Sequence, residues 1–295
     1  MPTHLPPAQL LEISGADALA FARAQFSSDV TLLADGHWQW SAWLSAQGRV
    51  RAFFQLLRAD STRLLAILRG GSAAALQVAL APYVLRSKVQ LLTPQALHTV
   101  GYFSAPEVQE AVHAVPQGQR FVEKDGAIGL ALPGVEPRWT VVTAAAPQIA
   151  AQDAPQDPDR WRAADIGAGI VHLDSALLDR YLPAWIGLDR LGAVSVSKGC
   201  YPGQEIVARM HFKGGNKRWL HRIEFTSTTL PADRTALDSG SETPPGELLN
   251  AVWIEPHHGV ALAVLPKLAD GTILKSPELP GALFRVVSAV ERAND

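Results

Sequence analysis

Cysteine is almost absent from this chain of 295 residues, which contains only one, Cys200. A single cysteine excludes an internal disulfide, and it cannot hold an iron–sulfur cluster without ligands from elsewhere. Long hydrophobic runs are also missing, since none reaches the ~18 apolar residues of a membrane span. The N-terminus lacks the basic start and apolar core of a signal peptide. We therefore predict a cytoplasmic protein that does not interact with a membrane.

An excess of positive charge is missing as well. Lysine and arginine total 26 against 28 aspartates and glutamates, giving a formal net charge of −2. This balance excludes a general attraction to DNA or to anionic membranes. A local basic run, formed by Lys213, Lys217, Arg218 and Arg222, could contact phosphates of transfer RNA, although a solvated turn is the simpler interpretation. No cluster with metal-ligand spacing stands out, so we predict no metal site.

Apolar residues are abundant, at 47% of the chain. This proportion predicts a large core, and the length suggests about two domains. Strand and helix patterns are mixed without strict alternation, which favours an α+β fold over an α/β fold. Beyond Gly214-Gly215, four apolar segments are separated by turns rich in proline and glycine: "WLHRIEF", "LNAVWIEP", "GVALAVL" and "ALFRVVSAV". They predict a small C-terminal β-barrel or sandwich.

Local signals predict individual elements. A strand, a turn at Ser14-Gly15 and a helix open the chain, and two strands flank a turn at Gln47-Gly48. A second helix should begin at an N-cap, Ser72, and end at Pro82. The stretch "AAAPQIAAQDAPQDPDR" is the best candidate for a linker or surface helix. Strands are predicted at "AVSVS" and "EIVARMHF", with the loop "KGCYPGQ" between them.

The lone cysteine lies in that loop. A buried structural thiol is the usual role of an isolated cysteine. Here Lys198 provides a nearby positive charge, which favours the reactive thiolate, and the glycines and proline around Cys200 favour a loop. Gln204 and Glu205 add an amide and a carboxylate that could bind a ring with donor and acceptor edges. The pattern therefore favours a ligand-facing loop over a purely structural turn.

The segment "KGCYPGQEIVAR" resembles the signature of the YgfZ family of folate-binding proteins, which support iron–sulfur enzymes and are related to the glycine-cleavage aminomethyltransferase (GcvT). The similarity extends from about Leu11 to Arg218 through "LLEISGADALAFARAQFSSDV", "SAWLSAQGRVRAFF", "YVLRSKV" and "RYLPAWIGLDRLGAVSVSKGCYPGQEIVARMHFKGGNKR". It implies a ring of two intertwined α+β domains followed by a small β-barrel. We expect a folate-binding region at residues 1–214, with one subdomain inserted at about 50–110, and the barrel at residues 215–295.

The resemblance also implies tetrahydrofolate, or a one-carbon derivative, as the cofactor in a central cleft beside the Cys200 loop. It assigns folate contacts to residues that match the family's motifs: Trp161, Asp29, Tyr201, Gln204, Glu205 and Arg209. Arg209 could pair with the folate carboxylates. Cys200 would be a redox or thiol-exchange group, and Lys198 could activate it.

Three positions depart from the patterns of relatives. The aminomethyltransferase carries an Asp-Asp pair that its amine chemistry needs. This chain has Ala52 and Phe53 at those positions. YgfZ-type proteins lack the pair too, so the loss agrees with the resemblance. Gly167 stands where relatives often carry glutamate, so a pterin partner is missing. Ala8 replaces a tryptophan that some members carry before the first strand.

Together these features predict a folate-binding accessory protein that supports the assembly or repair of iron–sulfur enzymes, including enzymes that thiolate transfer RNA. Its partners would be folate and those client enzymes. One alternative is a tetrahydrofolate-dependent one-carbon transferase, which would need a substitute for the lost carboxylate pair. The other alternative is a transfer-RNA-binding module that uses the basic run.

Overall fold

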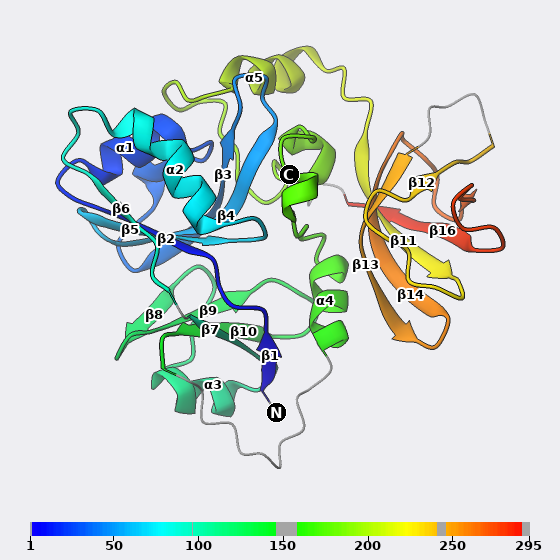
Figure 1. The fold of residues 1–295 in the computed structure, drawn as a ribbon, viewed down its shortest axis with the longest axis horizontal. Helices are drawn as coiled ribbons and strands as arrows, with labels where there is room; N and C mark the ends of the chain where they lie inside the picture. Colours follow the sequence, from blue (N-terminus) through cyan, green and yellow to red (C-terminus); the bar gives the residue numbers. More distant parts are fainter. Residues whose placement is uncertain (1, 96, 146–157, 241–245, 291–295) are drawn as a thin grey trace.

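The computed structural model describes residues 2–95, 97–145, 158–240 and 246–290. In these ranges the chain forms three antiparallel sheets with helices packed around them (Figure 1). The N-terminal sheet has the order β3 (His37–Leu44), β4 (Val50–Asp60), β5 (Arg63–Leu68), β2 (Leu10–Ser14), β6 (Gln90–Leu92). The middle sheet has the order β1 (Thr3–Leu5), β7 (His98–Tyr102), β10 (Arg138–Thr143), β9 (Ala127–Leu132), β8 (Phe121–Lys124).

The C-terminal sheet is a nearly closed six-stranded barrel. Its order is β12 (Ala236–Leu237), β13 (Gly246–Glu255), β14 (His258–Leu265), β11 (Trp219–Thr226), β16 (Leu283–Ala289), β15 (Ile273–Leu274). The four longest of these strands are the four apolar segments that the sequence predicted beyond Gly214-Gly215. Inward-facing Phe225, Leu248, Ala263 and Phe284 form its core.

The first two sheets are intertwined along the chain. β1 pairs with β7 of the middle sheet, with Thr3 opposite Gly101, although all five strands of the N-terminal sheet lie between them in sequence. The chain therefore begins in the middle sheet, leaves it to build the N-terminal sheet, and returns. This arrangement confirms the predicted α+β class with two intertwined layers.

Helices α1 (Ala18–Gln25) and α2 (Ala73–Val84) cover one face of the N-terminal sheet. In α1 the buried residues are Ala18, Phe21, Ala22 and Gln25, which lie on one side of a helix of 3.6 residues per turn. In α2 the Ser72 hydroxyl accepts a hydrogen bond from the Ala75 backbone nitrogen (3.3 Å), as predicted for an N-cap. The helix continues two residues past Pro82, so the predicted end was too early.

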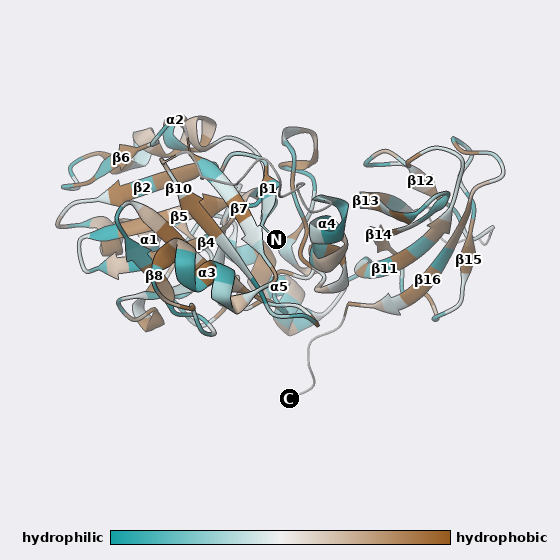
Figure 2. Ribbon diagram, turned by 90° about the horizontal axis from the view of Figure 1, so that it is seen from below, coloured by the Kyte–Doolittle hydropathy of each residue, from teal (hydrophilic) through white to brown (hydrophobic). Residues whose placement is uncertain are grey.

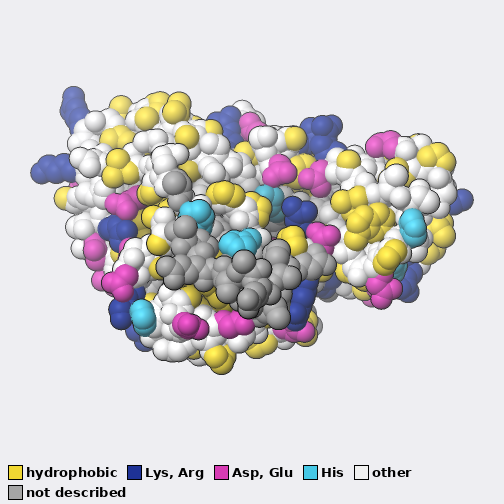
Figure 3. Space-filling view, turned by 60° about the horizontal axis from the view of Figure 1, so that its bottom comes forward, with side chains coloured by type: hydrophobic (Ala, Val, Ile, Leu, Met, Phe, Trp, Pro, Cys, Tyr) yellow, Lys and Arg dark blue, Asp and Glu magenta, His cyan; other side chains and the backbone are white. Residues whose placement is uncertain are grey.

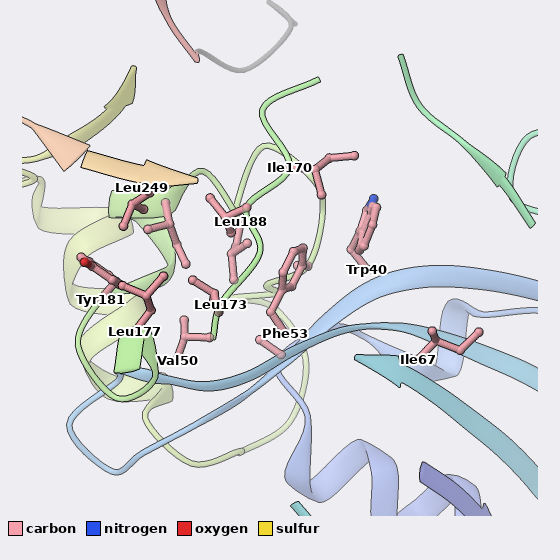
Figure 4. Packing of buried hydrophobic residues seen from close by; sticks show 14 of the residues in the cluster. Trp40, Val50, Phe53, Ile67, Ile170, Leu173, Leu177, Tyr181, Leu188 and Leu249 are labelled. Carbon is pink, nitrogen blue, oxygen red and sulfur yellow. The ribbon is translucent and has the colours of Figure 1, made fainter. Parts of the chain in front are cut away.

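The other face of the N-terminal sheet contributes to a central core that joins all three sheets. Phe53 and Ile67 come from the N-terminal sheet, Leu130 from the middle sheet and Leu249 from the barrel. Leu173, from the segment after α4 (Pro158–Gly167), packs among them (Figure 4). Figure 2 shows α4 between the barrel and the two other sheets. The remaining helices are α3 (Ala105–Val112), on the middle sheet, and α5 (Gln204–Lys213).

Two predicted strands are wrong. Residues 205–212 lie in helix α5, and residues 193–197 form no strand. Alternating Ile206, Ala208 and Met210 fit a strand, but Ile206, Val207 and Met210 also recur at helical spacing, and short apolar runs fit both patterns. Gly203, with φ +77°, turns the chain at the helix start.

Most of the predicted linker, residues 146–157, lies outside the described residues. The division into domains at residue 214 stays a prediction. In the part of the chain that the structure describes, no helix is long and apolar enough to cross a membrane.

Candidate functional site

The signature segment around Cys200 is held against the end of α1 and the turn between β3 and β4. The backbone nitrogen of Ser195 donates to the Ser27 carbonyl (2.8 Å), and the Ser27 hydroxyl donates to the Ala193 carbonyl (2.7 Å). The Tyr201 hydroxyl donates to the Ser195 carbonyl (2.9 Å). The two bonds to Ser27 join residues that are more than 160 positions apart in sequence, so only the tertiary structure brings them together.

Lys198 is the buried anchor of this segment. Its ammonium group donates to the carbonyls of Arg23 (2.6 Å) and Phe26, which are among the last carbonyls of α1. A cation is favourable at this helix end because the carbonyl dipoles point toward it. The nitrogen also lies 4.7 Å from the centre of the Tyr201 ring. Burial lowers the pKa of Lys198 to about 8; Asp29 opposes this shift and Arg23 reinforces it.

A close approach of two glycines fixes the turn before α5. A Cβ atom on Gly203 would lie 2.5 Å from the Ser45 carbonyl oxygen and 2.7 Å from the Gly48 Cα atom. Both glycines have positive φ, +77° and +74°. Only glycine fits this contact without displacing backbone. The β3–β4 hairpin turn, which the sequence predicted at Gln47-Gly48, therefore packs directly against the signature loop.

Cys200 itself is exposed, and so are Glu205 and Arg209 on α5. Gln204 is half-buried, and its amide nitrogen donates to the Lys198 carbonyl (3.1 Å). Tyr201 is buried in the central core. The structure thus brings the signature residues into one region and presents the thiol at its surface. Their predicted roles toward folate stay predictions.

Asp29 lies beside this region at the start of a 3₁₀ turn, Val30–Leu32. Its carboxylate accepts bonds from the Thr31 nitrogen (3.0 Å) and the Thr31 hydroxyl (2.6 Å). The hydroxyl bond lowers the pKa of Asp29, burial opposes the shift, and the charges of Lys198 and Arg23 lower it further. Asp29 therefore stays ionised near Lys198 at neutral pH.

Trp161 lies elsewhere, on α4 against the middle sheet. Its ring fills the space above Gly101, where a Cβ atom would be 2.6 Å away. The Arg138 guanidinium lies 5.0 Å from the ring centre, and Phe103 packs edge-on at 5.4 Å. Arg138 is fully buried and pairs with Asp165 (2.8 Å). Because Arg138 and Phe103 already pack on it, Trp161 offers a folate ring little free surface in this arrangement.

An aromatic surface with an unsatisfied amide lies on the central face of the N-terminal sheet, and the motif analysis missed it. The Trp40 ring stacks on Phe53, with ring centres 5.1 Å apart, and Trp38 meets Trp40 edge-on. Gln55, opposite Trp40 in the β3–β4 pair, is 1% exposed, and its amide nitrogen has no hydrogen-bond partner among the described residues. The period-two pattern "HWQW" was the available signal.

These side chains are buried in the central core, with Trp40, Phe53 and Gln55 at 4%, 1% and 1% exposure. A flat heterocycle with acceptor atoms at its edge needs aromatic packing and a hydrogen-bond donor, and Trp40 and Gln55 supply both. A buried donor without a partner is costly, which makes Gln55 a reasonable ligand contact.

The structure shows where the residues lie that depart from the patterns of relatives. Ala52 is buried under the helices and Phe53 in the central core, so apolar packing occupies both positions of the lost carboxylate pair. Gly167 ends α4, is exposed, and has no atom within 4 Å of where its Cβ would be. Ala8 packs at the edge of the central core.

Charges of both signs are scattered over the face shown in Figure 3, without a field of one sign. Among the residues that the structure describes, no group of three or more histidine, cysteine or acidic side chains is placed to hold a metal ion.

The fold has a counterpart among solved structures. The chain superimposes with a TM-score of 0.75 on the crystal structure of glycine cleavage system aminomethyltransferase T from Bartonella henselae, covering 97% of this chain and 84% of that chain at 15% identity. This similarity establishes the aminomethyltransferase fold. No family model matches the chain.

Two curated proteins are more similar to this chain in sequence. The chain is 28% identical over 233 residues to the tRNA-modifying protein YgfZ of Edwardsiella ictaluri, which covers 75% of this chain and 70% of that protein. It is 27% identical over 292 residues to the tRNA-modifying protein YgfZ of Escherichia coli, with coverages of 94% and 86%. These relatives confirm the resemblance that the signature segment indicated.

Proposed function

We propose that this protein is a cytoplasmic, folate-binding accessory protein that supports the assembly or repair of iron–sulfur enzymes, including enzymes that thiolate transfer RNA. The observation that carries the proposal is the exposed Cys200 on a loop fixed by Lys198, Tyr201 and Gly203. A structural thiol would be buried, whereas this one is exposed, as a thiol that reacts with a partner must be. Similarity to proteins named for transfer RNA modification supports the proposed link to enzymes that thiolate transfer RNA.

Tetrahydrofolate would bind at the central face of the N-terminal sheet. Trp40 and Phe53 would pack against the pterin, and Gln55 would donate a hydrogen bond from its free amide nitrogen. Bound tetrahydrofolate would supply a one-carbon carrier or a reductant. The chain's own residues bind and orient it, with Trp161 and its partner Arg138 supporting the adjacent middle sheet.

A one-carbon transferase has less support. Amine transfer in this fold would need a carboxylate where Ala52 and Phe53 stand, and both positions are buried in apolar clusters. Turnover of an amine substrate with tetrahydrofolate would revive this alternative.

Calorimetric titration with tetrahydrofolate tests the binding part of the proposal. Wild type should show saturable binding, and Gln55→Leu, which keeps the volume and removes the amide, should weaken it about tenfold. Gln109→Leu is the matched control, because it makes the same substitution at an exposed position on α3. Unchanged binding by Gln55→Leu would remove the central face from the proposal.

The thiol role needs a separate test. Cys200→Ser should bind tetrahydrofolate as wild type does, yet fail to restore iron–sulfur enzyme activity in bacteria that lack the equivalent protein. Full restoration by Cys200→Ser would contradict a role for the thiol while leaving the folate site intact.

A further inference from the structure

A second site is indicated by a cavity of about 570 Å³ between the β3–β4 hairpin, the segment 179–185 and the barrel. Its volume is within the range of small-molecule and cofactor sites. Residues from four separate stretches line it, namely Arg49, Asp179–Tyr181 with Trp185, Arg218, and Arg234 with Glu247 of the barrel. None of the predicted folate-contacting residues and no part of the Trp40 surface lines it.

The cavity is rich in arginine. Arg49, Arg180, Arg218 and Arg234 line it, against two carboxylates, Asp179 and Glu247. Asp179 is also paired with Arg51 (3.2 Å), which lies outside the lining. Glu247 lies between two of the arginines, 3.7 Å from Arg180 and 3.9 Å from Arg234, which is too long for strong hydrogen bonds. Among the described residues, Arg49, Arg180 and Arg234 by themselves outnumber the two carboxylates of the lining.

Two buried hydrogen-bond donors of the lining lack a partner. The Nε atom of Arg180 and the indole nitrogen of Trp185 are buried and have no hydrogen-bond partner among the described residues. Arg49 is held in place by its bond to the Arg180 carbonyl. A cavity with fixed guanidinium groups and unsatisfied N–H donors matches an anion that accepts several bonds. Planar arginine forks recognise carboxylate and phosphate, and phosphate offers the larger number of acceptor oxygens.

The surroundings favour an extended phosphate chain. Arg218 follows Lys213, which ends α5, and Lys217; both lysines are exposed, so further positive charge lies close to Arg218 along the chain. Arg222, which the sequence grouped with these residues, is instead bound to the Gly167 carbonyl (2.9 Å) and the Ser288 hydroxyl (3.0 Å). We propose that this arginine cavity binds phosphate groups of an RNA strand.

The proposal goes beyond folate binding and is independent of it. The test measures binding of fluorescent transfer RNA by anisotropy at several salt concentrations. Arg180→Gln and Arg218→Gln should each weaken binding about tenfold and reduce its salt dependence, because each removes a phosphate contact. Arg285→Gln is the matched control, since Arg285 pairs with Glu224 on another part of the barrel.

Glu247→Gln gives a result that damage to the fold cannot mimic. It removes the negative charge between Arg180 and Arg234, so RNA should bind severalfold more tightly. Equal binding by wild type and all of these variants would overturn the proposal, and so would weaker binding by Glu247→Gln. Thermal unfolding of the same preparations shows whether each variant is intact, so the outcome of this test does not depend on the folate site.

Competition identifies the source of the phosphate. Adenosine 5′-monophosphate that displaces RNA, when adenosine does not, would support the phosphate site and point to a mononucleotide as an additional ligand. If unlabelled transfer RNA competes, and neither adenosine nor its monophosphate does, the result would support an RNA strand as the ligand. Equal competition by adenosine and its monophosphate would show that phosphate is not recognised, and would overturn the proposal.

Discussion

At the scale of single residues, the signature segment combines one exposed reactive group with buried supports. Cys200 is exposed, whereas Lys198 and Tyr201 are 7% and 6% exposed. The sequence suggested that Lys198 activates the thiol. In the structure its ammonium group is bound to the carbonyls at the end of α1, so its contacts are those of an anchor. The loop geometry thus depends on a charge that is buried and hydrogen-bonded.

Lys198→Met should lower the free energy of unfolding at pH 7 by about 1–3 kcal/mol, because the carbonyls of Arg23 and Phe26 lose a charged donor. Burial holds the pKa of Lys198 at about 8 in the folded protein, below its ordinary value of 10.5. Between these pH values the unfolded chain binds more protons, so this residue's contribution to stability rises with pH.

Chemical denaturation at pH 7, 8.5 and 10 measures both effects. The difference between wild type and Lys198→Met should grow as pH rises through this window, and Lys267→Met, at an exposed position, should show no such trend. A constant difference would show that Lys198 has the same pKa in the folded and unfolded chains.

Gly167→Glu should increase the affinity for tetrahydrofolate. The position has room for a side chain, and it would restore the carboxylate that relatives often carry there. A new hydrogen bond donated by the pterin to this carboxylate should improve binding about threefold to tenfold in calorimetry. Gly167→Gln, with the same length and no charge, is the control, and equal affinities of the wild type and the Glu variant would place the pterin away from α4.

At the scale of elements, the signature loop depends on the contact between the β3–β4 hairpin and the turn that begins α5. Gly203→Ala should destabilise the protein by more than about 2 kcal/mol, since its Cβ would collide with the Ser45 carbonyl and with Gly48. Gly192→Ala separates the cost of the collision from the cost of placing alanine at a positive φ. Gly192 has a similar φ, +69°, and open space, so it should cost only about 1 kcal/mol. Thermal unfolding of the two variants provides the comparison, and equal losses would mean that the hairpin yields to the added methyl group.

At the scale of the whole molecule, Asn250 of the barrel clamps the segment after α4. Its side chain accepts from the His172 nitrogen (2.7 Å) and donates to the His172 carbonyl (2.8 Å). Asn250→Ala should lower stability by about 2–3 kcal/mol, because two hydrogen bonds are lost and alanine is disfavoured at φ +50°.

Asn250→Gly isolates the bonds, since glycine accepts this φ without strain. It should lose about 1–2 kcal/mol and should be cut faster than wild type by a protease in the connection between α5 and β11. A wild-type cleavage pattern for both variants would show that the central core alone holds the barrel in place.

Much of the fold was available from the sequence. Periodic apolar residues predicted α1, α2, the β3–β4 hairpin and the barrel strands, since each pattern reports which face of a local element is buried. The strand predicted at residues 205–212 is wrong, because the apolar residues of this short, half-exposed segment fit both the strand period of two and the helical period of 3.6. The helix instead packs against a nearby turn, Pro183–Ile186, across a small apolar cavity.

The sequence alone determined the α+β class, the absence of disulfides and the signature around Cys200, because these depend on composition and on residues adjacent in the chain. The tertiary structure decided the rest. It directed Lys198 toward α1, placed Trp161 against Arg138, and left Gln55 beside Trp40 without a partner. It also gathered arginines from four distant stretches around one cavity. Such contacts join residues far apart in the chain, and their geometry depends on how sheets and barrel pack, which no local pattern contains.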